Sequence, residues 1–167
     1  MKDILERTSV RAYTNQEISK EDIEKILRAG FSAPSAHDYR PWEFIVVQNK
    51  ETLEKTSTVS QYSTMMKDAG FGLVVLVDMR QEGLDIEHGI MDTAAATENM
   101  LIAAKKLGIG SCWIGGYPKQ DRLDKLRELF DIPEYCTPMW MVAFGYPETW
   151  PPVKDKWDES KIHYEKY

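Results

Sequence analysis

The run Gly72-Leu73-Val74-Val75-Leu76-Val77 decides which fold this sequence can adopt. Its residues are apolar without a break, whereas a strand with one face in water alternates apolar and polar side chains. A strand of this kind must be covered on both faces by other elements. The sequence therefore predicts that this run lies in the centre of a sheet.

Three other segments have strand character. Trp42 to Val47 is rich in β-branched and aromatic residues, and Pro138 to Gly145 is a second apolar run. A short strand is enclosed by glycines in Gly108-Ile109-Gly110-Ser111-Cys112-Trp113-Ile114-Gly115-Gly116. This is not a dinucleotide fingerprint, because two of its glycines precede the strand instead of following it.

Four segments predict helices. The first begins after the N-cap Ser19 and is ended by Pro34. The other three cover Glu51 to Ala69, Ile86 to Leu107 and Asp121 to Phe130. The longest is stopped by Gly108 and is partly apolar on both faces. Small residues at positions 94 to 96 would let another helix approach closely, so this helix is buried either in a large core or in a dimer interface.

Length and composition indicate one domain and exclude several classes of partner. The chain has 167 residues, 43 % of them hydrophobic, and a formal net charge of -6. An acidic chain does not favour nucleic acid or an anionic membrane as partner. The first residues lack the apolar segment of a signal peptide, and no apolar run could span a bilayer, so a cytoplasmic location is expected. Two isolated cysteines and three scattered histidines give no metal-ligand spacing and predict no disulfide.

The segment Arg7-Thr8-Ser9-Val10-Arg11 is suited to bind a phosphate. Two guanidinium groups four residues apart would lie on one side of a helical turn or short loop. Arginine grips phosphate oxygens in pairs, and the hydroxyls and backbone amides between them add donors. The alternative is a solvated, amphipathic surface segment.

A polar loop and a glycine pair are further candidates for ligand contact. Ala33 to Pro41 is dense in turn formers and polar side chains, and it connects a helix to a buried strand, where ligand-binding groups are common. A plain connection would use the same residues. Gly115 and Gly116 can bring bare backbone amides against a flat ligand, although a simple turn would need the same glycines.

The last segment, Tyr146 to Tyr167, is expected to be extended. It contains three prolines and carries scattered aromatic and aliphatic side chains. Such a segment is too apolar for a free end, so it should pack on its own domain or on a partner subunit. Lys154 and Lys156 are available there for an anion.

Five segments, in order along the chain, resemble motifs of the nitroreductase family of FMN-dependent oxidoreductases. They are Arg7 to Arg11, the segment Pro34-Ser35 to Pro41-Trp42-Glu43-Phe44, the helix from Asp92 through Asn99-Met100-Leu101, the segment Leu107 to Pro118, and Gly145-Tyr146-Pro147. The resemblance covers nearly the whole chain.

The resemblance implies an α+β fold, with a central, mostly antiparallel sheet flanked by helices, in an intertwined homodimer. Residues 1–167 would form a single FMN-binding domain whose tail, about 146–167, packs on the partner subunit. Each flavin would then take its phosphate clamp from one chain and the Pro34-Ser35 loop from the other.

The resemblance also implies which residues bind FMN. Arg7, Thr8, Ser9 and Arg11 would hold the phosphate and ribityl, and Lys154 or Lys156 would complete the anion site. Ile114, Gly115 and Gly116 would lie along the isoalloxazine ring, with a backbone amide facing N5. The remaining cofactor contacts would be Pro34, Ser35 and Asp38.

Two residues depart from the family pattern. Asp38 stands where many relatives have Asn, and an ionised carboxylate only accepts hydrogen bonds. Near the flavin pyrimidine edge its charge would disfavour the anionic reduced flavin, so we expect a lower reduction potential than in an Asp38→Asn variant. Arg40 replaces the more common Gln, and it would either pair with Asp38 or recognise an anionic substrate.

The implied activity is hydride transfer from NADH or NADPH, through flavin N5, to a nitroaromatic, quinone or similar electron-poor acceptor in a ping-pong cycle. The flavin does this chemistry, so no side chain is assigned as catalytic acid or base. One alternative is a specialised relative that performs dehalogenation, flavin breakdown or dehydrogenation. Another is a flavin-binding sensor or storage module without efficient turnover, and a third is a flavin-free domain.

Overall fold

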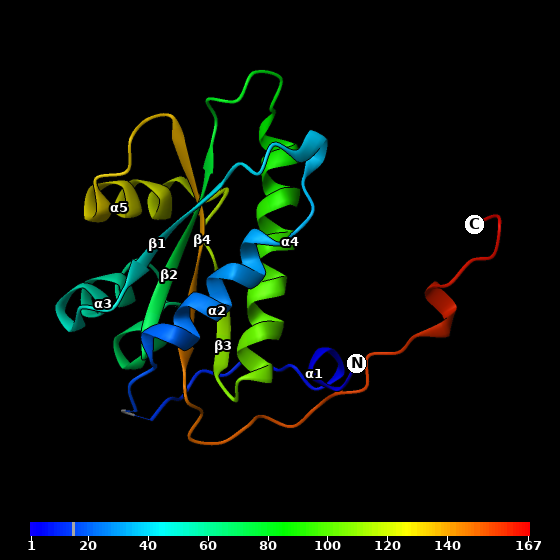
Figure 1. Ribbon diagram of the computed structural model, residues 1–167, viewed down its shortest axis with the longest axis horizontal. Helices are drawn as coiled ribbons and strands as arrows, with labels where there is room; N and C mark the ends of the chain where they lie inside the picture. The colour runs from blue at the N-terminus through cyan, green and yellow to red at the C-terminus, as the bar shows by residue number, and fades with distance from the viewer. Residues whose placement is uncertain (15) are drawn as a thin grey trace.

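An antiparallel sheet lies between two layers of helices (Figure 1). The structure is a computed structural model and describes residues 1–14 and 16–167. Its strands are β1 (Trp42–Val47), β2 (Phe71–Asp78), β3 (Gly110–Gly115) and β4 (Cys136–Gly145), in the order β1-β2-β4-β3. Its helices are α1 (Lys2–Leu5), α2 (Lys20–Phe31), α3 (Lys50–Ser57), α4 (Ile86–Lys106) and α5 (Gln120–Phe130), with short 3-10 turns η1 (Ala36–Asp38), η2 (Thr64–Asp68) and η3 (Glu159–Lys161). The predicted α+β class and antiparallel sheet are confirmed.

The apolar run at residues 72–77 lies inside the sheet, as predicted. It forms most of β2, which pairs antiparallel with β1 on one side and with β4 on the other. Its alternate side chains enter different cores: Val74 and Leu76 face one, and Leu73, Val75 and Val77 face the other. Both faces of the strand therefore exclude water, which explains the unbroken apolar sequence.

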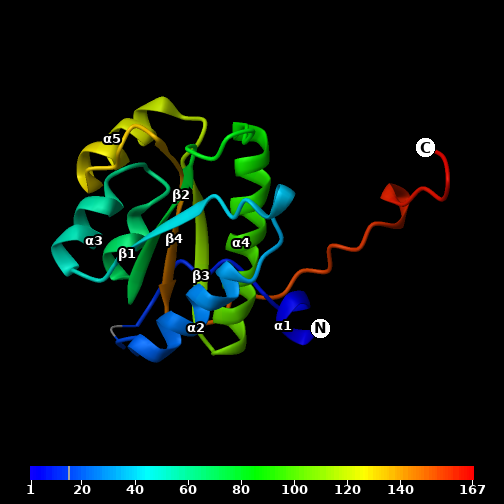
Figure 2. The same cartoon turned by 45° about the horizontal axis from the view of Figure 1, so that its top comes forward.

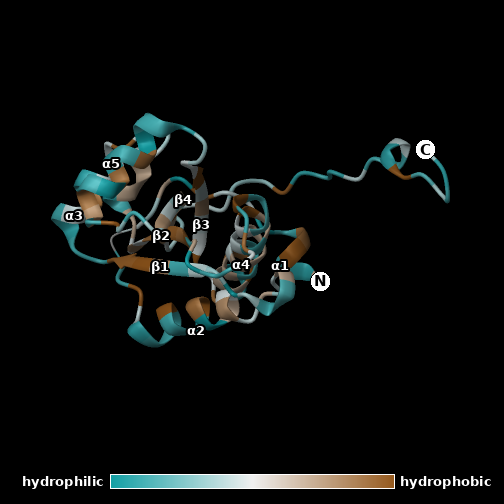
Figure 3. Cartoon of the chain, turned by 90° about the horizontal axis from the view of Figure 1, so that it is seen from above, coloured by the Kyte–Doolittle hydropathy of each residue, from teal (hydrophilic) through white to brown (hydrophobic). Residues whose placement is uncertain are grey.

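The helices are distributed over both faces of the sheet. Figure 3 shows α3 and α5 on one side and α2 and α4 on the other, and Figure 2 shows α4 running alongside the strands. Leu53 of α3 and Leu126 of α5 belong to the first core. Ile26 of α2 and Met100 of α4 belong to the second. The long helix thus buries one stripe in the core of its own chain.

The ends of these helices follow local capping chemistry. The Ser19 side chain accepts a hydrogen bond from the Asp22 backbone N–H at 3.1 Å, which confirms the predicted N-cap of α2. Gly108, after the end of α4, has φ +75°, a conformation that a residue with a Cβ rarely adopts. The helix α2 ends at Phe31, earlier than the expected stop at Pro34.

The single helix expected over Glu51 to Ala69 is wrong. The helix α3 ends at Ser57, a turn follows, and η2 begins at Thr64. The Ser63 hydroxyl is the cause: it donates to the Ser57 and Ser60 carbonyls, 2.9 and 2.8 Å away, and accepts from the Ser60 N–H. Serine side chains that bond to nearby backbone groups in this way compete with the helix.

The structure also bears on membrane spans, disulfides and metal sites. Within residues 1–14 and 16–167, no helix combines the length and the apolar character needed to cross a membrane. Cys112 and Cys136 are both buried, and neither takes part in a disulfide. In the same ranges no three His, Cys, Asp or Glu residues gather as metal ligands would.

Candidate functional site

The segment with the paired arginines lies along the outer edge of β3. Val10 donates its backbone N–H to the Ser111 carbonyl at 2.9 Å, and Ser9 pairs with Ser111 in parallel. Of the two expected forms, the helical turn is wrong, because α1 ends at Leu5. The residues that follow form the short loop, which is docked on the strand edge at Ser9 and Val10. Val10 is buried, and neighbouring side chains of an extended segment point the other way. This is how the two arginines come to share one side.

A pocket of about 300 Å³ lies on that side. Four of its lining side chains are cationic, two from the N-terminal segment and two from the tail. The lining residues are Leu5, Arg7, Thr8, Ser9, Arg11, Pro151, Pro152, Val153, Lys154 and Lys156. The structure thus brings together all six residues that the sequence proposed for an anion site.

Two details of this pocket concern its capacity for a ligand. Arg7 Nε lies 3.1 Å from a carboxylate oxygen of Glu98 on α4, which orients the guanidinium. The Thr8 hydroxyl oxygen is buried and has no hydrogen-bond partner among the described residues. A buried polar atom without a partner is costly, so an oxygen-rich ligand here would satisfy it.

The tail reaches this pocket because its first part is tied to its own chain. Pro147 pairs with Tyr13, and the Glu148 N–H donates to the Ala12 carbonyl at 3.2 Å. The Lys105 ammonium lies 3.6 Å from the ring centroid of Trp150. Beyond the pocket the chain leaves the body of the molecule as an extended arm (Figure 1).

A second hollow, the β3 groove, shares the lining residue Arg11 with the first. It measures about 410 Å³ and is lined by Arg11, Gln61, Tyr62, Thr64, Met65, Cys112, Trp113, Ile114 and Gly115. In an antiparallel ladder, alternate residues turn their backbone groups to the same side. The Ser111 carbonyl faces outward, and therefore the N–H and C=O groups of Trp113 and Gly115 do so too. Among the described residues these two N–H groups have no backbone acceptor, so the groove has free backbone donors along the strand edge.

The two glycines at the end of β3 have different roles. An added Cβ at Gly115 would meet nothing within 4 Å, so the backbone there is open to a flat ligand. An added Cβ at Gly116 would lie 2.7 Å from the Met139 carbonyl oxygen. That oxygen accepts from the Gly116 and Tyr117 backbone N–H groups, 3.2 and 2.6 Å away. Met139 lies at a bulge in β4, a feature common beside active sites.

The thiol in the β3 groove is not set up as a nucleophile. Burial raises the pKa of Cys112, and the nearby charges of Arg11 and Arg7 oppose that rise only in part. A neutral thiol is a poor nucleophile. Cys112 therefore serves as a small apolar side chain in the groove wall.

The loop at residues 33–41 has a strained backbone held by specific contacts. His37, Asp38 and Arg40 have φ values of 49°, 59° and 51°, in a region that non-glycine residues rarely occupy. The Ala36 N–H donates to a carboxylate oxygen of the buried Asp92 on α4 at 2.9 Å. Strain of this kind persists only where surrounding contacts impose it, and it is frequent at ligand-binding sites.

Of the two roles considered for Arg40, the structure shows the ion pair. Its Nε donates to an Asp38 carboxylate oxygen at 2.7 Å, and a second bond joins Nη2 to the other oxygen. Hydrogen bonding from Arg40 lowers the pKa of Asp38. Ser35 supports the turn, since its hydroxyl oxygen accepts from the Arg40 N–H at 3.0 Å. The carboxylate that departs from the family pattern therefore has a local counter-ion.

Within one chain this loop and the arginine pocket are separate. Pro34, Ser35, Asp38 and Arg40 line neither the pocket beside Arg7 nor the β3 groove. Arg40 lines a different hollow of about 260 Å³, together with Arg80.

Several lining residues were missed from the sequence. Gln61, Tyr62, Thr64 and Met65 were assigned to the interior of a helix, but they border the β3 groove. The signal that could have found them is the polar run of serines around Tyr62, which is unfavourable in a helix interior. Glu98 was also missed, because its contact with Arg7 spans 91 positions of sequence.

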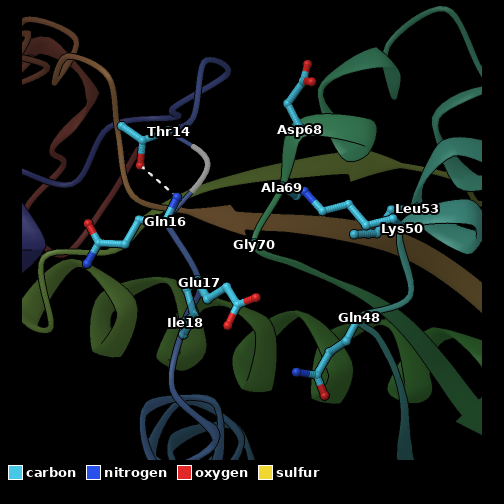
Figure 4. Close-up of a pocket in the computed structure, with 10 residues that line it drawn as sticks. All are labelled: Thr14, Gln16, Glu17, Ile18, Gln48, Lys50, Leu53, Asp68, Ala69 and Gly70. Atoms are coloured by element: carbon cyan, nitrogen blue, oxygen red, sulfur yellow. Dashed lines mark hydrogen bonds between the residues drawn. The ribbon is translucent and has the colours of Figure 1, made fainter.

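A further hollow of about 230 Å³ lies elsewhere on the molecule and is shown in Figure 4. Glu17 and Asp68 border it together with Lys50, and all three side chains are exposed. Its charges are mixed and solvated, so it offers no single chemistry to a ligand.

The sequence matches the model of a known protein family. The model of the nitroreductase family matches residues 4–64 and 57–146. A protein of Methanothermobacter thermautotrophicus, provisionally named NADH dehydrogenase/NAD(P)H nitroreductase, is 42 % identical over 169 residues, which cover 99 % of this chain and 88 % of that protein.

Solved structures agree with the sequence comparison. A crystal structure of a protein with the same provisional name from Bacteroides thetaiotaomicron has a TM-score of 0.93 at 39 % identity, covering 99 % of this chain and 96 % of the other. An FMN-dependent nitroreductase from Clostridium difficile has a TM-score of 0.92 at 29 % identity and matches over the whole of both chains.

Proposed function

The chain belongs to the nitroreductase family, and from this premise we propose that it is an FMN-dependent oxidoreductase that uses NADH or NADPH to reduce nitroaromatic, quinone or similar electron-poor acceptors. The observation that carries the proposal is that Arg11 lines both a cationic pocket and the β3 groove. A phosphate-bearing ligand with a flat ring system needs this combination.

The residues present fit FMN. Arg7, Arg11, Lys154 and Lys156 supply positive charge for its phosphate, and the unpartnered Thr8 hydroxyl would gain a partner there. Ser9 adds a further hydroxyl. Charge-assisted hydrogen bonds to phosphate are about twice as strong as neutral ones, so the arginines would dominate this end of the site.

The groove fits the ring system. Ile114 gives an apolar wall, and Gly115 and Gly116 give a backbone edge that is held by β4. These residues would hold the ring, and bound FMN would supply hydride transfer through N5 between NAD(P)H and the acceptor in a ping-pong cycle. The residues of this chain bind and orient the ring and leave an open face for each substrate in turn.

A homodimer would complete the site. Its support is the tail, whose residues from Trp157 onward project from the body and expose Trp157 and Tyr164 by 74 % and 84 %. An arm with exposed aromatic side chains needs a partner surface. We propose that it packs on a second copy, and that the strained loop carrying Pro34, Ser35 and Asp38 contacts the flavin of that copy.

The test is the visible spectrum of the purified protein after incubation with FMN and removal of free flavin, followed by anaerobic addition of NADH or NADPH. Retained yellow colour that bleaches supports the proposal and justifies a screen of acceptors. Retained colour that does not bleach favours a flavin-binding sensor or storage module. A protein without retained flavin would contradict the proposal.

A further inference from the structure

The β3 groove is also lined by residues outside the strand. Tyr62 lines the groove from the turn between α3 and η2, and it is 59 % exposed. The guanidinium of Arg122, on α5, lies 5.5 Å above the Tyr62 ring centroid. Arg122 Nη1 also donates to the Gly115 carbonyl at 2.6 Å. One side chain therefore contacts both the Tyr62 ring and the Gly115 backbone.

We propose that Arg122 is a positioning residue of this groove, which ties Tyr62 to the Gly115 backbone and so holds the aromatic ring as the outer wall against which a flat ligand packs. This inference rests on the proposed function of the groove. It adds a residue that does not line the groove and acts only through two residues that do.

Arginine has the chemistry for this role. Its planar guanidinium stacks on an aromatic face while its fixed donors reach a carbonyl, whereas lysine presents a single compact charge. The Gly115 carbonyl faces away from β4, so the sheet ladder gives it no partner, and Arg122 is the donor that the structure provides. The Tyr62 hydroxyl makes no hydrogen bond within the described ranges, so the guanidinium of Arg122 above its ring is the polar contact that the structure gives this side chain.

Arg122 also carries an uncompensated charge to the groove. Within residues 1–14 and 16–167 no carboxylate lies close enough to form an ion pair with it. A positive charge beside the groove favours a negatively charged ligand state. We therefore expect Arg122→Gln to lower the midpoint potential of bound FMN. Arg122→Lys keeps the positive charge and should change this potential less.

The decisive experiment is a double-mutant cycle on FMN binding. Arg122→Ala, Tyr62→Ala and the double variant are titrated with FMN by flavin fluorescence. Each single substitution should raise the Kd by roughly three- to tenfold, the size expected for contacts at a partly exposed site. The double variant should bind little more weakly than either single variant, because the two residues act as one unit.

A kinetic readout separates positioning from general damage. With 1,4-benzoquinone as acceptor and saturating FMN, Arg122→Ala should raise KM more than it lowers kcat, since a less firmly held flavin ring offers the acceptor a poorer binding face. Arg127→Ala is the matched control: this arginine lies on the same helix and donates to the Pro133 carbonyl at 3.0 Å, away from the groove. It should leave the FMN Kd unchanged.

The outcomes distinguish the inference from the function on which it rests. If the wild-type protein does not bind FMN, the proposed function fails. If it binds FMN but Arg122→Ala binds equally well, or if the effects of the two single variants simply add, the positioning role is refuted and the function stands. Should Arg122→Ala not fold, Arg122→Gln replaces it in the cycle, because glutamine can donate to Gly115 but cannot stack as a cation on Tyr62.

Discussion

Replacing Arg7 by alanine tests the anion pocket most directly. Arg7 uses Nε to bind Glu98, and its side chain is only 20 % exposed. Its remaining guanidinium donors are available to a ligand in the pocket that it lines. A hydrogen bond to a charged group contributes about 1.5 to 3 kcal/mol. Because 1.4 kcal/mol corresponds to about tenfold, the Kd for FMN should rise by roughly 10- to 150-fold.

The cost of this substitution to folding should be smaller than its cost to binding. The Glu98 side chain is 44 % exposed, so its pair with Arg7 resembles a surface ion pair, which contributes about 0.2 to 1 kcal/mol. The Arg7→Ala variant should therefore fold and lose flavin. Fluorescence titration of the flavin-free protein gives the Kd, and urea unfolding gives the change in stability.

Two comparison variants sharpen this result. Arg28→Ala removes an exposed arginine that pairs with Glu24 on α2, and it should not change the FMN Kd. Glu98→Gln removes a negative charge near the pocket but keeps an acceptor for Arg7, so it should leave the Kd unchanged or lower it. A folded Arg7→Ala variant with the wild-type Kd would refute the assignment of this pocket to the phosphate.

Three further substitutions test other parts of the structure. Gly116→Ala should lower stability to urea by about 1 to 3 kcal/mol, because its Cβ would lie 2.7 Å from a backbone oxygen of β4, and unchanged stability would contradict that packing. Arg80 lowers the pKa of Asp78, so this carboxylate stabilises the fold above its unfolded pKa of about 3.9, and the contribution disappears as the pH falls through the folded pKa. Asp78→Asn should therefore lose less stability than the wild type between pH 7 and pH 3 in urea unfolding, and an equal loss would exclude this role. Asp38→Asn leaves the charge of Arg40 unpaired, so redox titration should show a higher midpoint potential of bound FMN, and equal potentials would place Asp38 too far from the flavin to act.

Elements with local sequence signals could be predicted before the structure was known. The unbroken apolar run of β2 predicted an interior strand, and Ser19 and Gly108 marked helix ends through side-chain capping and a left-handed backbone. The order of short motifs was sufficient to identify the family. These signals are set by residues that are close together in the sequence, so they can be seen without knowing how the chain folds.

The assembly of the site depends on contacts between distant parts of the chain. Ser63 breaks the expected helix through bonds to Ser57 and Ser60, and this places Tyr62 in the β3 groove. Arg122 reaches Gly115 and Tyr62 only once α5 has packed against β4 and α3. Likewise, the tail lysines meet the N-terminal arginines because the chain after β4 returns along the N-terminal segment. Such contacts join residues far apart in the sequence, and their partners are set by how the layers pack rather than by any local pattern.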